Sequence, residues 1–124
     1  MTPQSVNAFG GFKVQGRNDS GDAIVADALA LQEAGCSGVV LELIPAELAA
    51  KITSSLSIPT IGIGAGPSCD AQVLVWTDLM GLTPKPPRFA RSYSNLRTEI
   101  IEGARRWMAD VENGSFPSEA ETFH

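Results

Sequence analysis

The chain has 124 residues, of which 44% are hydrophobic and 19% are charged, and its formal net charge is −5. This length and composition are typical of one globular domain with a substantial core. The negative charge argues against a nucleic-acid partner, because phosphate binding depends on clustered Lys and Arg. We interpret a small basic group at Lys85, Arg88 and Arg91 as a solvated linker, with contact to an anionic ligand as the alternative.

The sequence offers no sign of a membrane or of secretion. No apolar run approaches the ~20 residues that a membrane helix needs, and no secretion signal opens the chain. Cys36 and Cys69 have no metal-like spacing and are expected to be free thiols in a cytoplasmic protein. Cys69 is not favoured as a nucleophile, because the only histidine is the terminal His124.

Periodicity and turn residues divide the chain into five consecutive parts. We predict one domain made of a surface loop (1–21), helix–strand units (22–82), a proline-rich linker (83–91), a C-terminal helix (92–113) and a polar tail (114–124). The linker contains three prolines in "LTPKPPRF" and can be neither helix nor central strand. Six apolar residues at helical spacing predict that the C-terminal helix packs on another element: Leu96, Ile100, Ala104, Trp107, Met108 and Val111.

Two helices are predicted within residues 22–82. The first covers 22–34, with Ser20 as a possible N-cap and Gly35 placed to end it. The second carries "AELAAKI" and begins near Pro45, which suits the first turn of a helix.

Three apolar runs in the same region predict strands, at 37–43, 58–63 and 72–76. Such runs are typical of strands that are buried on both faces of a parallel sheet. We also expect Trp76 and Trp107 to lie in the core. The alternation of helices and strands predicts an α/β fold, and three strands would leave two open edges. We therefore interpret the sheet as part of a larger one.

Glu42 is the first candidate for chemistry, because it is an acidic residue within the apolar run "VVLELIP". It lies near the carboxyl end of a predicted strand, where α/β folds carry their active sites. A partly desolvated carboxylate at that place could act as a general base. The alternative is a structural acid that pairs with a lysine or a backbone amide.

The glycine-rich turn "GIGAG" is the second candidate. Gly62, Gly64 and Gly66 could offer backbone amides to an anion, but no GK[ST] follows and the spacing fails the dinucleotide fingerprint. A tight turn that passes close to another element is the favoured interpretation. Asp70 and Asp78 could each bind a metal, although we expect Asp70 to pin the turn.

Four stretches follow one another in the order and spacing of one family: "TPQSVNAFGGFKVQGR", "VVLELIPAELA", "IPTIGIGAGPSCDAQVLVWTDLMGL" and a late "FP". With these stretches the chain resembles ketopantoate (3-methyl-2-oxobutanoate) hydroxymethyltransferases over essentially its whole length. The resemblance implies the C-terminal half of a (β/α)8 TIM barrel, a fold of typically about 250 residues. Residues 1–21 would be the loop after the fifth strand, followed by strands six, seven and eight with their helices.

The resemblance also implies a reaction. Family members transfer a hydroxymethyl group from 5,10-methylenetetrahydrofolate to 3-methyl-2-oxobutanoate, giving 2-dehydropantoate for pantothenate and coenzyme A synthesis. The substrate chelates Mg²⁺, and the glutamate of an "LE-x-x-P" stretch takes the C3 proton; Glu42 matches it, with Pro45 in step. The family's metal ligands come from strands one to four, which this chain lacks, so the chain alone is expected to be inactive. Family members are cytoplasmic homo-oligomers, commonly decamers.

One departure from the family concerns Ala71, which stands in "CDAQVLV" where the family usually has glycine. It would be unfavourable only if this position needs a positive φ. Three hypotheses follow from the sequence. The chain is part of a hydroxymethyltransferase, a non-catalytic half-barrel that associates with itself or a partner, or an unrelated phosphate-binding module that uses the glycine turn.

Overall fold

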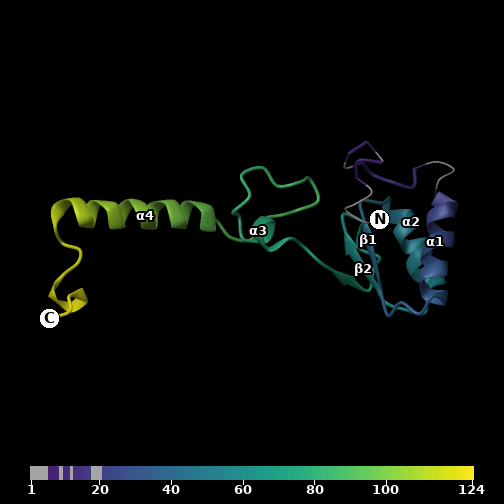
Figure 1. Cartoon of the computed structure of the whole chain (residues 1–124). Helices are drawn as coiled ribbons and strands as arrows, with labels where there is room; N and C mark the ends of the chain where they lie inside the picture. The colour runs from purple at the N-terminus through teal and green to yellow at the C-terminus, as the bar shows by residue number, and fades with distance from the viewer. Residues whose placement is uncertain (1–5, 9, 12, 18–20) are drawn as a thin grey trace. The chain divides into compact units, whose positions relative to one another are not determined.

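The chain forms two units, residues 1–74 and 75–124, and each is described by itself. The computed structural model describes residues 6–8, 10–11, 13–17 and 21–124 (Figure 1). Ser20, the expected helix cap, lies outside the described residues. The elements are α1 (Gly21–Glu33), β1 (Val39–Glu42), α2 (Ala46–Ser55), β2 (Thr60–Ile63), β3 (Ala71–Gln72), α3 (Trp76–Leu79), α4 (Leu96–Asn113) and a short 3-10 helix, η3 (Glu119–Glu121).

The three strands form one sheet in the order β1-β2-β3, and both pairs are parallel. This confirms the predicted α/β fold with a small parallel sheet. The third strand is shorter than the prediction of 72–76, because Trp76 begins α3. Gly62 pairs with Gln72, and β2 ends one residue later at Ile63. Residues 74–76 therefore have no β2 backbone beside them with which to continue the ladder.

Among the described residues of this unit, helices cover one face of the sheet. Figure 1 shows α1 and α2 on the same side of β1 and β2. Val39 and Leu41 point into the core formed there, whereas Val40 between them is 49% exposed. The prediction that this strand is buried on both faces was therefore wrong, since α1 and α2 pack on a single face. The core consists of Ala28, Val39, Leu41, Ile44, Leu48, Ala49, Ile52 and Ala65.

The ends of α1 and α2 follow the sequence signals. Gly35 has φ 89, and the N–H of Cys36 donates to the carbonyl of Leu31, so Gly35 ends α1 as predicted. Pro45 lies at the N-cap of α2, one residue before the helix begins.

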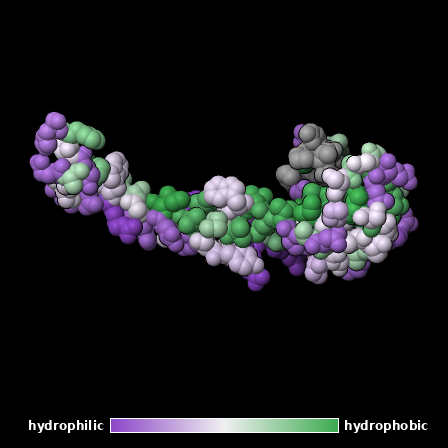
Figure 2. Space-filling view, turned by 90° about the horizontal axis from the view of Figure 1, so that it is seen from below, coloured by the Kyte–Doolittle hydropathy of each residue, from purple (hydrophilic) through white to green (hydrophobic). Residues whose placement is uncertain are grey.

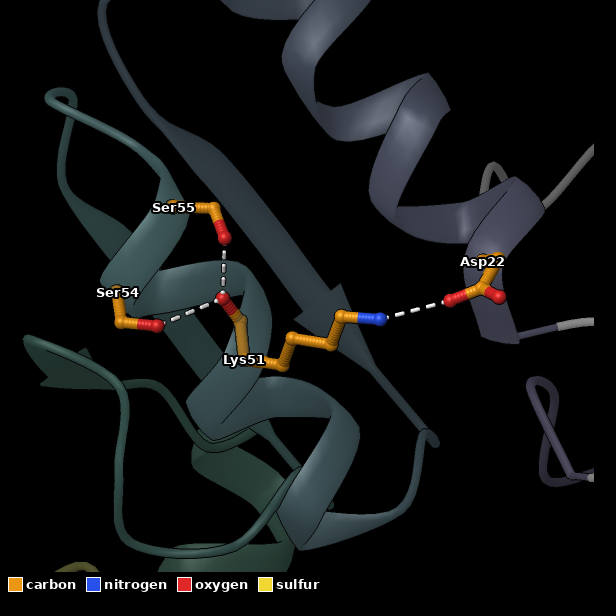
Figure 3. Close-up of polar contacts among 4 residues, drawn as sticks. All are labelled: Asp22, Lys51, Ser54 and Ser55. Carbon is orange, nitrogen blue, oxygen red and sulfur yellow. Dashed lines mark hydrogen bonds and ion pairs between the residues drawn. The ribbon is translucent and has the colours of Figure 1, made fainter.

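Polar contacts join α1 to α2 and stabilise the end of α2. The Lys51 Nζ lies 2.7 Å from Oδ1 of Asp22, which lowers the pKa of that aspartate by hydrogen bonding and charge (Figure 3). The hydroxyls of Ser54 and Ser55 both donate to the Lys51 carbonyl, at 2.9 and 2.7 Å. These last two helical residues thus hydrogen-bond back to the preceding turn.

In the second unit, the proline-rich linker contains no helix or strand, as predicted, and returns the chain to α3. The N–H of Tyr93 donates to the carbonyl of Leu79 at 2.8 Å, and that of Leu96 donates to Met80 at 3.0 Å. Gly81 has φ 70, and a Cβ there would lie 2.2 Å from the Ser94 carbonyl oxygen. Only glycine at position 81 allows the backbone of Ser94, just after the linker, to pass this close to the end of α3.

The C-terminal helix, α4, ends at Asn113 as predicted but begins at Leu96, later than the predicted start at residue 92, and it buries none of its residues. Its apolar stripe is exposed, including Ile100 (58%), Trp107 (55%) and Met108 (53%). Figure 2 shows apolar and polar residues on opposite sides of this helix. Trp76 is exposed as well, so the expectation that both tryptophans lie in the core was wrong. The amphipathic pattern predicted a packing partner, and no described residue buries this stripe.

Candidate functional site

The carboxyl ends of β1 and β2 bring the two main candidates together. Glu42 is the last residue of β1 and pairs with Ile63, the last residue of β2. The N–H of Leu43 donates to the Ile63 carbonyl at 3.0 Å, so the two strands end at the same level. Gly62 of the predicted turn belongs to β2, so the turn itself begins at Gly64, and Glu42 lies beside it.

The Glu42 side chain belongs to the uncovered face of the sheet. Side chains alternate along a strand, so Glu42 shares the face of Val40, opposite to the buried Leu41. The residue is half-buried, and its carboxylate forms no hydrogen bond or ion pair with any residue in the described part of the chain. The structural alternative, an acid paired with a lysine or a backbone amide, therefore finds no partner among those residues. A carboxylate in this state is able to accept a proton from a bound molecule.

Leu43, directly after Glu42, has an unusual backbone conformation. Its φ is 51, which makes it the one non-glycine residue with a positive φ in the described part of the chain. This left-handed conformation costs an L-residue on the order of 1–2 kcal/mol. Such conformations persist where the surrounding structure enforces them, often at functional sites. Nothing in the sequence signals this conformation, because glycine and asparagine are typical of such positions and leucine is not.

The carbonyl of Leu43 is held by the segment 13–17. The N–H of Gln15 donates to that carbonyl at 2.9 Å. The next residue, Gly16, has φ 75, and a Cβ there would lie 2.3 Å from Leu48 Cδ2 and 3.0 Å from Ile24 Cδ1. Gly16 thus lies against α1 and α2, and Gln15 is bonded to the residue after β1, while residues 13, 14 and 17 are exposed. The prediction of a surface loop missed this contact.

The glycine turn approaches another element closely, as the favoured interpretation required. Gly64 and Gly66 have φ values of 64 and 78. A Cβ at Gly66 would lie 2.5 Å from the Cβ of Ala46, the first residue of α2. The carbonyl of Gly66 also accepts a hydrogen bond from Gln72 Nε2 at 3.0 Å. The turn therefore needs glycine for its backbone conformation and for its contact with α2.

Asp70 pins the connection between β2 and β3, in agreement with the prediction. Its Oδ2 accepts hydrogen bonds from the N–H and the hydroxyl of Thr60, at 2.8 and 2.9 Å. The backbone N–H of Thr60, followed by its hydroxyl, holds the pKa of the Asp70 carboxyl below its ordinary value. Because Thr60 begins β2, Asp70 lies at the opposite end of the sheet from Glu42.

The other candidates do not add to this site. Asp78 is buried in α3, which belongs to the second unit. Cys36 and Cys69 are free thiols, and Cys69 packs against the core. The three cationic residues of the linker are exposed: Lys85, Arg88 and Arg91.

The described residues contain no group of three His, Cys, Asp or Glu side chains that could hold a metal ion. They do not by themselves fit the Mg²⁺ that the resemblance implies. Among the helices in the described ranges, none is both long and apolar enough to cross a membrane.

Comparison with known proteins places these features in a family. The family model for ketopantoate hydroxymethyltransferase matches residues 1–119. The chain is 60% identical to the 3-methyl-2-oxobutanoate hydroxymethyltransferase of Acidothermus cellulolyticus, over 99% of this chain and 46% of that protein. It is 54% identical to the protein of that name from Mycobacterium ulcerans, over 99% and 42%, and 55% identical to that from Trichlorobacter lovleyi, over 99% and 47%.

The chain thus spans about half the length of the curated relatives that it matches. The match covers both units, including β1, the glycine turn and α4. The chain belongs to the ketopantoate hydroxymethyltransferase family.

Proposed function

We propose that this chain supplies the proton acceptor of a 3-methyl-2-oxobutanoate hydroxymethyltransferase. The reaction transfers a hydroxymethyl group from 5,10-methylenetetrahydrofolate to 3-methyl-2-oxobutanoate and gives 2-dehydropantoate, a precursor of pantothenate and coenzyme A. The observation that carries the proposal is the place of Glu42. It is an acid at the carboxyl end of a parallel strand, beside a glycine turn and on the open face of the sheet.

The role of Glu42 follows from the chemistry of the substrate. C3 of 3-methyl-2-oxobutanoate is next to a keto group, so removal of its proton gives an enolate that can attack a one-carbon unit at that carbon. A carboxylate without other hydrogen-bond partners can take this proton when the substrate lies within hydrogen-bond reach. The bare backbone at Gly64 would leave room for the ketoacid and the folate beside Glu42.

The metal is proposed to be held by residues outside this chain. The resemblance implies Mg²⁺, and the described residues offer no cluster that fits it. This chain therefore contributes the proton-accepting group alone. An α-keto acid is a weak carbon acid, so a carboxylate alone would remove its proton slowly. The isolated chain is accordingly proposed to be inactive.

We further propose that the open face of the sheet is covered by a second part of a barrel. Val40 and Val73 are 49% and 47% exposed, and β1 and β3 are edge strands. Uncovered parallel sheets are rare, because both faces are normally buried. The three strands would then be strands six to eight of a (β/α)8 barrel in a cytoplasmic homo-oligomer. The same observation favours the second candidate function, a non-catalytic half-barrel that associates with itself or with a partner.

The two candidates are separated by complementation. The chain is co-expressed with the segment of the Acidothermus cellulolyticus relative that lies outside the match, and 2-dehydropantoate formation is measured with Mg²⁺, 3-methyl-2-oxobutanoate and 5,10-methylenetetrahydrofolate. The proposal expects product from the assembly and none from either piece alone. Glu42→Gln should abolish it, while Glu33→Gln, at an exposed position at the end of α1, should not. A stable assembly that forms no product would support the non-catalytic half-barrel instead.

A further inference from the structure

We infer that Leu43 is a positioning residue for Glu42, and that its left-handed backbone, held by Gln15, fixes the direction of the carboxylate. The inference rests on the proposed role of Glu42 as the proton acceptor. It concerns the backbone of Leu43 and the contacts that hold it. Leu43 itself need not touch the substrate.

The burial pattern shows what the unusual φ of Leu43 does. In a regular strand, residues two apart point to the same face, so Glu42 and Ile44 would face the same side as Val40. Instead, Ile44 is 6% exposed and belongs to the core, while Val40 is 49% exposed. The left-handed residue between Glu42 and Ile44 breaks the alternation. It allows the carboxylate to stay on the open face while the next apolar side chain enters the core.

Two hydrogen bonds hold the peptide groups on either side of Leu43. Its N–H donates to the carbonyl of Ile63 at 3.0 Å, and its carbonyl accepts from the N–H of Gln15 at 2.9 Å. The first bond fixes the residue to the end of β2. The second fixes it to a segment that Gly16 keeps in close contact with Leu48. Because both peptide groups are bound, the conformation of Leu43 is set by its neighbours rather than by its own preference.

A fixed backbone next to a general base matters because the rate of proton transfer depends steeply on the position of the base. A displacement of about 1 Å at a reacting group can reduce a rate about a hundredfold. If Leu43 returned to an extended conformation, either Glu42 would leave the open face or Ile44 would leave the core. The cost of losing the core contact makes rotation of Glu42 the expected outcome.

The test compares two substitutions of nearly the same size. Leu43→Ile keeps the composition of the side chain but adds β-branching, which strongly disfavours positive φ, whereas Leu43→Asn is similar in shape and tolerates it. Both are measured in the co-expressed assembly with the Acidothermus cellulolyticus segment, by loss of the C3 proton signal of 3-methyl-2-oxobutanoate in D₂O. We expect Leu43→Ile to lower kcat by at least about tenfold, with KM within about twofold. Leu43→Asn should keep most of the kcat of the unchanged chain.

A second pair keeps the inference testable if Leu43→Ile does not assemble. Gly16→Ala places a methyl group against Leu48 Cδ2 and should displace the Gln15 N–H from Leu43. We expect a lower kcat for exchange, which the double variant Gly16→Ala with Leu48→Ala should partly restore by making room.

Glu42→Gln serves as the reference that separates the two claims. If Glu42→Gln abolishes exchange while Leu43→Ile and Gly16→Ala leave kcat unchanged, the positioning role is overturned and the proposed function stands. If Leu43→Asn is as slow as Leu43→Ile, the side chain rather than the backbone conformation matters, and the inference is also overturned. Normal exchange by Glu42→Gln would contradict the proposed function itself.

Discussion

Glu42 and Ile63 are the last residues of two adjacent parallel strands and lie opposite each other in register. The residue that follows each strand has a positive φ. At Leu43 and Gly64, therefore, the two segments of the chain leave the sheet at the same level. This pair of turns places an acidic side chain beside a stretch of glycine backbone. The two candidates from the sequence, Glu42 and the glycine turn, therefore belong to one site.

The glycine turn should be sensitive to a single methyl group at Gly66. Gly66→Ala must adopt φ 78 and place its Cβ 2.5 Å from that of Ala46, so both strain and overlap oppose it. We expect a loss in the free energy of unfolding of about 2–4 kcal/mol, from a backbone cost of about 1 kcal/mol plus overpacking. This loss is measured by urea unfolding of the chain co-expressed with the Acidothermus cellulolyticus segment.

Gly35→Ala is the matched control, since Gly35 has φ 89 but a Cβ there would meet nothing within 4 Å. It should show only the backbone cost, about 1 kcal/mol. Equal losses for the two variants would show that the contact with Ala46 is unimportant.

Ala71 should be neutral or favourable compared with glycine. Ala71 lies in β3, and its φ is not positive, so the position does not require glycine. Ala71→Gly is therefore expected to lower the free energy of unfolding by about 0.5–1 kcal/mol, through the greater entropy of glycine in the unfolded chain. An increase in stability, measured by the same urea titration, would contradict this.

The stability of the first unit should depend on acid through Asp70. Its pKa is lowered in the folded chain, so the unfolded chain binds more protons as the pH falls. The contribution of Asp70 is complete above the ordinary pKa of 3.8 and is lost as the pH falls through the lower folded value.

Asp70→Asn should remove this part of the acid dependence, which is measured as unfolding free energy against pH. Asp27→Asn, at an exposed position of α1, is the control and should keep it. Parallel pH curves for Asp70→Asn and the unchanged chain would show that the hydrogen bonds to Thr60 do not bias the protonation of Asp70.

The apolar stripe of α4 should promote self-association of the isolated chain, because exposed apolar surface of this kind favours contact between molecules. Met108→Lys places a charge in the stripe and should reduce association in sedimentation velocity experiments. Ala109→Lys adds the same charge at the next, exposed residue outside the stripe. If both variants reduce association equally, net charge is responsible and the stripe is not.

The sequence predicted local elements well where a short-range signal defined them. Gly35 ended α1, the apolar runs gave parallel strands, and "VVLELIP" located Glu42 at a strand end. Features that depend on distant parts of the chain were missed. The length of β3 is limited by the end of β2, and the conformation of Leu43 is set by hydrogen bonds to Ile63 and Gln15. No residue type at these positions announces such constraints.

Burial was the least predictable property. The stripe of α4 was visible in the sequence, and the apolar run of β1 predicted burial on both faces, but the sequence could not say which faces have a partner within this chain. Val40 and Trp107 are apolar residues typical of a core, and both are exposed. For the candidate site, the sequence predicted the position of Glu42 at a strand end. Its place on the uncovered face of the sheet and the two hydrogen bonds that hold Leu43 were seen only in the structure.

The most direct test of the account is C3 proton exchange by the co-expressed assembly in D₂O, without folate, which isolates the proton transfer from the later steps. The unchanged chain should exchange the C3 proton of 3-methyl-2-oxobutanoate in a Mg²⁺-dependent manner, and Glu42→Gln should reduce the rate to that of the solution without protein. A Glu42→Gln assembly that exchanges this proton at the unchanged rate would show that Glu42 is not the proton acceptor.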